Sequence, residues 1–143
     1  IWLMSSSTVR KSDLGVAVAF GLRHNQPIAN KGIEPMSTVY IPHIVRRASN
    51  GSLTPKFDFT EAAQFGALKE IVGEFEDLLF TDRITSIVQE ALEDFQPDDY
   101  LLAVGDPTAI ALCAGVIFRK HSSVKMLKWD RQTRKYLMLE LKL

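Results

Sequence analysis

A short strand that runs directly into a capped helix is the feature that most limits what this chain can fold into. Residues 100–104, "YLLAV", are apolar at every position, as a strand is when both faces of its sheet are covered. After Gly105, Asp106 is a good helix N-cap and Pro107 suits the first helical position. A buried strand joined so closely to a helix predicts an α/β fold with a parallel sheet.

The same alternation of strand and helix extends through the rest of the chain. We expect a strand at 38–44, where Pro42 predicts an edge strand or a bulge. The later pattern predicts a small mixed β-sheet with two parallel β-α-β crossovers, a C-terminal antiparallel hairpin and Rossmann-like layering. The expected strands are 67–73, 100–104, 123–130 and 135–143, and the expected helices are 81–95 and 106–121.

Local patterns also predict the segments between these elements. Residues 45–57 resemble a polar loop with a turn at Asn50-Gly51, because this dipeptide favours positive φ. Residues 74–80 are either a short strand or an ordered loop. In the last strand, alternation predicts one buried face, formed by Leu137, Leu139, Leu141 and Leu143.

Helix caps can be assigned from residue type at two further places. Residues 58–66 are expected to form one or two helical turns, capped by Asp58 or Thr60 and ended by Gly66. The helix at 81–95 should be capped by Thr81 or Asp82.

Length and composition limit how many domains the chain can form. The chain has 143 residues, of which 46% are hydrophobic and 24% charged, and its formal net charge is zero, as is ordinary for a globular domain. We expect residues 36–143 to form a single α/β domain and residues 1–35 to form an N-terminal extension or arm. No apolar run approaches the about 18 residues that a membrane-spanning helix needs, so no membrane partner is expected.

Charge is unevenly distributed along the chain. Residues 119–143 contain eight Lys or Arg and two acids, whereas ten acids and one base lie between Glu70 and Asp99. An acidic flank and a basic C-terminal edge can orient a charged partner. The alternative is that both are solvated surfaces without a partner.

The turn at residues 105–108 is one candidate site. A helix N-terminus can bind an anion, and Gly105, Asp106 and Thr108 would line such a site. However, the Asp106 carboxylate would occupy the N–H groups that a phosphate needs, and only one glycine precedes the helix. Structural capping is therefore favoured over a ligand role.

The basic C-terminal hairpin is the stronger candidate for partner binding. Basic residues beside aromatic ones on a β-ribbon can contact a nucleic-acid backbone and stack on bases, or bind a protein. The alternative is that Trp129 and Tyr136 form a cross-strand pair that stabilises the hairpin, with Asp130 bonded into the turn. The candidate partner-binding residues are Lys125, Lys128, Trp129, Arg131, Arg134, Lys135 and Tyr136.

Other chemistry has little support in the sequence. His24, His43 and His121 are far apart, and the one cysteine, Cys113, lies in an apolar helix where we expect it to be a core residue. No spacing typical of zinc ligands, nucleotide-binding loops or hydrolase nucleophiles is present, so no metal, cofactor or catalytic residue is assigned.

Two motifs resemble small uncharacterised proteins of tailed phages, including cyanophages. These motifs are "DYLLAVGDP" at 99–107 and "KMLKWDRQ" at 125–132, followed by Tyr136. The "TVYIP" strand and "TPKFDFTEAAQFG" are similar as well, so the resemblance covers about residues 36–143. It implies a phage protein acting in the cytoplasm of a bacterial host, and it implies no specific site.

Three functions remain open from the sequence. The leading hypothesis is a non-enzymatic interaction or regulatory protein that binds a host or phage protein, or a nucleic acid, through the basic hairpin and the acidic flank. The alternatives are a nucleotide- or phosphate-binding domain, possibly enzymatic, that uses the 105–108 turn, and a virion or assembly component. The apolar helix at 107–118 and the leucine-rich last strand favour a homodimer.

Overall fold

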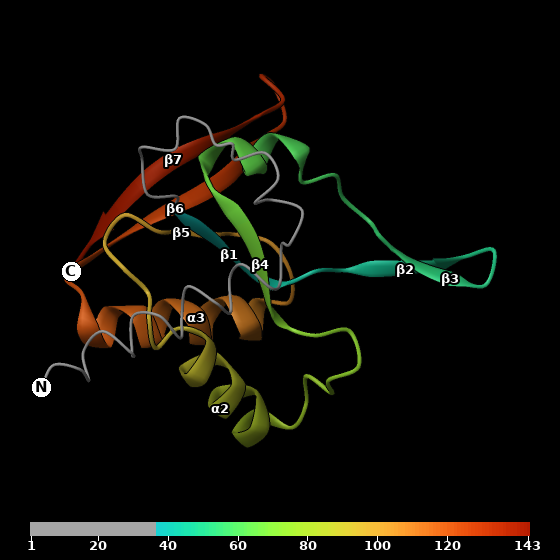
Figure 1. The fold of residues 1–143 in the computed structure, drawn as a ribbon, viewed down its shortest axis with the longest axis horizontal. Coiled ribbons are helices and arrows are strands. Elements are labelled where there is room, and N and C mark those ends of the chain that lie inside the picture. Colours follow the sequence, from blue (N-terminus) through green and yellow to red (C-terminus); the bar gives the residue numbers. More distant parts are fainter. Residues whose placement is uncertain (1–36) are drawn as a thin grey trace, which may run out of the picture. The chain divides into compact units, whose positions relative to one another are not determined.

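Five strands form the central sheet of the computed structural model, which describes residues 37–143 (Figure 1). The expected extension at 1–35 lies outside the described residues. The strand order is β4-β1-β5-β6-β7, parallel except for the antiparallel pair β6–β7. The strands are β1 (Thr38–His43), β4 (Ala67–Val72), β5 (Tyr100–Leu102), β6 (Ser123–Asp130) and β7 (Lys135–Lys142).

Helices cover the two faces of this sheet unequally. Two helices, α2 (Thr81–Ala91) and α3 (Pro107–Lys120), pack on one face, and the 3₁₀-helix η2 (Thr60–Phe65) packs on the other (Figure 1). The helix-side core includes Ile84, Val88, Cys113 and Ile117, and the opposite core includes Phe59 and Ala62. The predicted mixed α/β sheet with a C-terminal antiparallel hairpin is confirmed.

The prediction that Pro42 marks an edge strand or a bulge is wrong, because β1 keeps one register with β4 on both sides of Pro42. β1 lies inside the sheet between β4 and β5. The proline is tolerated there because β5 is short and pairs with only Val39 and Tyr40 of β1. Pro42 therefore follows the part of β1 that has a neighbour on both sides.

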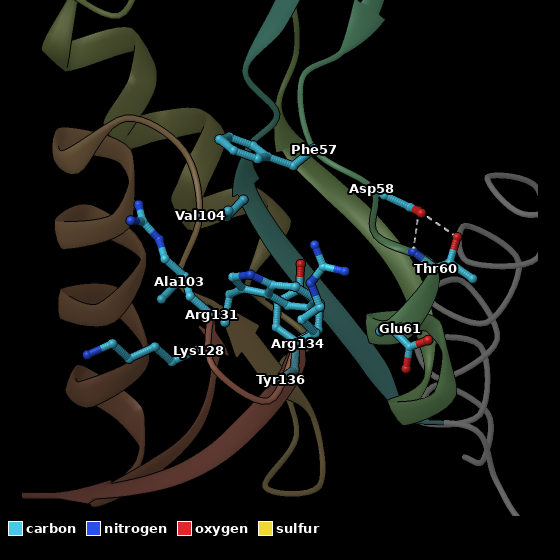
Figure 2. A pocket seen from close by; sticks show the side chains of 11 residues that line it. Phe57, Asp58, Thr60, Glu61, Ala103, Val104, Lys128, Arg131, Arg134 and Tyr136 are labelled. Carbon is cyan, nitrogen blue, oxygen red and sulfur yellow. Dashed lines mark hydrogen bonds between the residues drawn. The ribbon is translucent and has the colours of Figure 1, made fainter.

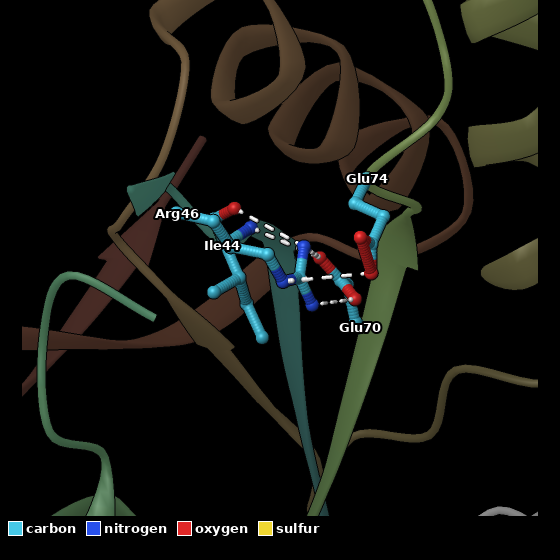
Figure 3. Close-up of polar contacts among 4 residues, drawn as sticks. All are labelled: Ile44, Arg46, Glu70 and Glu74. Carbon is cyan, nitrogen blue, oxygen red and sulfur yellow. Dashed lines mark hydrogen bonds and ion pairs between the residues drawn. The ribbon is translucent and has the colours of Figure 1, made fainter. Parts of the chain in front are cut away.

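The segment expected to be a polar loop forms a second, two-stranded sheet. β2 (Arg46–Ser49) pairs antiparallel with β3 (Ser52–Pro55), and the predicted turn at Asn50-Gly51 has φ of 50° and 80°. Arg46 fixes the base of this hairpin to β4 (Figure 3). Its guanidinium donates two hydrogen bonds to Glu70, at 2.9 and 2.8 Å, and forms an ion pair of 3.9 Å with Glu74. Hydrogen bonding to Glu70 raises the pKa of the Arg46 guanidinium.

Two predicted helix caps differ from the structure. The N-cap of η2 is Phe59, not Asp58 or Thr60, and no side chain caps this helix, whereas Gly66 ends it as predicted. The N-cap of α2 is Phe80, not Thr81 or Asp82, and its carbonyl accepts from the N–H groups of Arg83 and Ile84 at 3.1 and 3.0 Å. No side chain caps α2, because the N-cap position falls on Phe80, whose side chain has no acceptor atom. Residues 74–80, the ambiguous segment, form an ordered loop.

The prediction that the leucine face of the last strand is buried is wrong, and Tyr136 is the one buried residue of β7. Tyr136 is buried, whereas Leu137, Leu139 and Leu141 are 37–47% exposed and Leu143 is almost fully exposed. Tyr136 faces η2, which contacts β7, while α3 packs over β1 and β6 on the other face. The leucines therefore lie on the helix side of an edge strand, where the described helices cover them incompletely.

Candidate functional site: an aromatic pocket beside the C-terminal hairpin

The strand-to-helix turn is built as a structural joint. Asp106 caps α3 as predicted, and its carboxylate accepts from the N–H groups of Thr108 at 2.9 Å and Ala109 at 3.4 Å. Gly105 has φ of 112° and lies directly against the backbone of His43 at the end of β1. A methyl group has no room at this position, so the glycine is required by packing. The predicted anion-binding role of Gly105, Asp106 and Thr108 stays a prediction that this geometry disfavours.

Removal of the Asp106 carboxylate should destabilise the chain modestly. Asp106→Ala leaves two helix N–H groups without their cap, and we expect a loss of about 1 kcal/mol in the free energy of unfolding. Asp106→Ser, which keeps an acceptor, should lose less than half of this. Urea denaturation measures both variants, and equal losses would contradict a capping role.

The C-terminal hairpin has the two features expected of a stable β-ribbon. Trp129 and Tyr136 lie opposite each other, with ring centroids 4.9 Å apart and ring planes at 64°. In the turn, the Asp130 carboxylate accepts from the backbone N–H groups of Gln132 and Thr133 and from the Thr133 hydroxyl. Hydrogen bonding from that hydroxyl holds the pKa of Asp130 below its usual range. The hairpin turn is thus rigid and presents Arg131 and Arg134 at its tip.

A cavity of about 760 Å³ lies between this turn and the start of η2. Figure 2 shows that three segments form its walls: residues 57–61, Ala103 and Val104 directly after β5, and the hairpin. We call this cavity the aromatic pocket. Its lining residues are Phe57, Asp58, Thr60, Glu61, Ala103, Val104, Lys128, Trp129, Arg131, Arg134 and Tyr136.

The aromatic pocket combines an apolar surface with opposed charges. Phe57 is 47% exposed and Trp129 is 40% exposed, so both rings present surface that an occupant can cover. Arg131 and Arg134 line the hairpin side, whereas Asp58 and Glu61 line the η2 side. Such a mixture suits a ligand that has an apolar group and an acidic group close together.

Two pKa shifts define the charges around the pocket. The pKa of Asp58 is lowered because its carboxylate accepts from the hydroxyl and the N–H of Thr60, so this carboxylate is ionised at neutral pH. The pKa of Tyr136 is raised, first by burial and then by the negative charge of Asp58. The Tyr136 phenol therefore stays protonated and neutral at neutral pH in the wall of the pocket.

Not all of the predicted hairpin residues reach this pocket. The structure brings together Lys128, Trp129, Arg131, Arg134 and Tyr136. Lys125 lies at the other end of β6, where it forms a 3.8 Å ion pair with Asp98 and stands over the Tyr100 ring. Lys135 lies opposite Asp130 in the register of β6 and β7, and it is exposed outside the pocket.

The expected acidic flank is partly neutralised. Glu70 is paired with Arg46, and Glu76 with Arg83 at 2.7 Å. Asp99 is buried and accepts backbone hydrogen bonds instead of facing solvent. Pairing and burial of these three residues therefore reduce the negative charge that the expected acidic flank presents.

Half of the pocket was not predicted from the sequence. Residues 57–61 and 103–104 are far from the hairpin along the chain, and only the fold brings them beside it. The one local signal was Phe57, a large apolar side chain in an otherwise polar segment. An aromatic residue in such a segment is worth marking as a candidate contact residue.

The remaining candidate residues lie apart from the pocket. Cys113 is fully buried in α3, and burial raises the pKa of its thiol to about 12, as expected for a core cysteine. His43 ends β1, and His121 follows the last turn of α3. Within residues 37–143, no group of three or more His, Cys, Asp or Glu side chains has metal-binding geometry. None of the helices described is both long and apolar enough to cross a membrane.

Comparison with known proteins gives one match. No curated protein and no solved structure matches the chain. A family model described as Phage Pam3 gp32-like protein matches residues 37–143, the whole of the part that the structure describes. The predicted resemblance to a phage protein is thereby confirmed in its broad form, and the chain belongs to the Phage Pam3 gp32-like protein family.

Proposed function

We propose that this phage protein acts by binding a protein partner, from the phage or its host, through the aromatic pocket. The observation that carries the proposal is that two exposed aromatic residues, Phe57 and Trp129, line the same cavity as Arg131 and Arg134. Tryptophan, tyrosine and arginine are the residue types that contribute most to the affinity of protein interfaces. A partner segment would insert an apolar side chain between the rings and pair a neighbouring carboxylate with the arginines.

The charges of the pocket favour a protein partner over a nucleic acid. Asp58 and Glu61 line the same cavity as the arginines and would repel a phosphate backbone. Lys125, which would extend a basic surface along β6, is already paired with Asp98. Residues 37–143 contain 13 Lys or Arg and 15 Asp or Glu, so the domain has no overall basic charge.

Capture of the partner from phage-infected cells, followed by titration with the purified partner, tests the proposal. Trp129→Ala should weaken binding by about 30-fold, the effect of losing about 2 kcal/mol at a central aromatic contact. The double variant Arg131→Ser/Arg134→Ser should weaken it at least as much. The matched control Arg119→Ser/Lys120→Ser removes the same charge from the exposed end of α3 and should bind normally.

Two results would overturn the proposal. In the first, no captured protein depends on Trp129 and the two arginines. In the second, the captured species is a nucleic acid, shown by loss of capture after nuclease treatment and by a steep decrease of affinity with salt.

A further inference from the structure

The outer edge of β7 carries an unusual amount of apolar surface. β7 ends the sheet, and among the described residues it pairs only with β6. It runs for eight residues without a proline, and its charged residues are Lys135, Glu140 and Lys142. Edge strands are normally protected by proline, a bulge, a short length or charged side chains, so the middle of β7, Tyr136 to Leu139, lacks such protection. Five of its apolar side chains, counting the residue that follows it, are exposed: Leu137, Met138, Leu139, Leu141 and Leu143.

The leucines form one row on the helix side of the sheet. Leu141 lies opposite Val124, and Leu139 lies opposite Met126. Residues opposite each other on paired strands share a face, and Val124 belongs to the core under α2 and α3. The row therefore continues the helix-side core beyond the edge of the sheet.

We propose that β7 pairs antiparallel with β7 of a second copy of this chain, with the two-fold axis passing through Leu139. In this register Leu139 faces itself, and Leu137 faces Leu141 of the other copy. On the opposite face, Met138 meets Glu140 and Tyr136 meets Lys142. Leu137, Leu139 and Leu141 each face a leucine, Leu143 faces Lys135, and no two like charges face each other.

Neighbouring registers fit less well. An axis through Glu140 places two glutamates directly opposite each other, which is unfavourable. An axis through Met138 lets only Leu137 and Leu139 face leucines, because Leu141 then faces Lys135 and Leu143 extends beyond the strand. Of these three registers, only the one through Leu139 lets three leucines face leucines without placing like charges opposite each other, which is the reason to choose a second copy as the occupant.

The solution mass of the full chain tests this interface. The wild type should sediment as a dimer of twice 16.1 kDa. Leu139→Glu places two introduced carboxylates on the axis and should weaken the dimer at least tenfold, as should Leu139→Lys. Mixing these two variants should restore a dimer, since opposite charges then meet. Leu79→Glu, at a position 86% exposed in the loop before α2, is the matched control and should remain dimeric.

Cysteine cross-linking tests the register on an intact dimer. Facing Cα atoms in an antiparallel pair are about 4.5–5.5 Å apart, within the range that a disulfide spans. Leu139→Cys should therefore form a covalent dimer on oxidation, and Leu137→Cys alone should not. An equimolar mixture of Leu137→Cys and Leu141→Cys should cross-link. The native Cys113 does not interfere, because it is buried.

Three outcomes would overturn the inference. The first is a monomeric wild type. The second is a dimer that Leu139→Glu leaves unchanged while circular dichroism shows an intact fold, and the third is that Leu137→Cys cross-links as readily as Leu139→Cys.

The result of this test is independent of the proposed function. Pocket variants test partner capture, whereas these variants change only the outer edge of β7.

Discussion

Replacement of Gly105 by alanine is expected to lower the free energy of unfolding by about 4 kcal/mol, enough to unfold a large fraction of a marginally stable domain. Two effects add. A residue with a side chain is strained at φ of 112°, and the new methyl group would overlap the carbonyl of His43 and approach its Cβ to 2.8 Å. The neighbour cannot move easily, because it belongs to the backbone at the end of β1.

Gly115→Ala is the matched control for this experiment. Gly115 lies on the exposed side of α3, where an added Cβ meets nothing within 4 Å. Alanine is favoured over glycine in a helix, so this variant should gain about 0.5–1 kcal/mol. Thermal and urea denaturation of both variants measure the contrast. A Gly105→Ala protein as stable as the wild type would contradict the close packing of the turn against β1.

Asp99→Ala is expected to cost about 3 kcal/mol, because two backbone N–H groups lose their acceptor. The buried carboxylate accepts from Thr38, at the start of β1, and from Gln96, both at 2.9 Å. It therefore joins the beginnings of β1 and β5 across 61 residues of sequence. Asp98→Ala is the control: its side chain is 88% exposed, and loss of its ion pair with Lys125 should change stability by less than about 1 kcal/mol.

The pH dependence of stability gives an independent test of Asp99. Burial, the largest cause, raises the pKa of this carboxyl above its ordinary value of 3.8, although its two backbone hydrogen bonds act in the opposite direction. The folded state then binds this proton more tightly than the unfolded state does, so the group adds stability as pH falls through its folded pKa towards 3.8. The stability of the wild type relative to Asp99→Asn should therefore increase over that interval. A decrease would mean that the hydrogen bonds outweigh burial.

Local sequence patterns predict correctly the features that depend on residues close together in the chain. The cap at Asp106, the turn at Asn50-Gly51 and the cross-strand pair of Trp129 and Tyr136 each depend on residues a few positions apart. The alternation of strands and helices likewise predicted the α/β class.

Predictions failed where distant segments decide the outcome. Pro42 was assigned to an edge because the shortness of its neighbour β5 cannot be deduced from β1 itself. The leucine face of β7 was expected to be buried because alternation shows that a strand has two faces but not which face is covered. Tyr136 is buried instead, since η2, about 70 residues earlier, packs on its side of the sheet.

One wall of the aromatic pocket can be predicted from the sequence, and the facing wall cannot. The hairpin wall could be predicted, since Lys128, Trp129, Arg131, Arg134 and Tyr136 stand close together in sequence. The facing wall at Phe57 and Asp58 could not, because it reaches the hairpin only through the path of the chain across the sheet.

The position of β1 inside the sheet has a consequence for how the protein folds during synthesis. β1 pairs with β4 about 30 residues later and with β5 about 60 residues later, whereas β6 and β7 form a local hairpin. When β1 and β4 leave the ribosome, one edge of β1 stays open until β5 has been made. Loops of this length close late and slow the folding rate, so the nascent chain is exposed to aggregation during that interval.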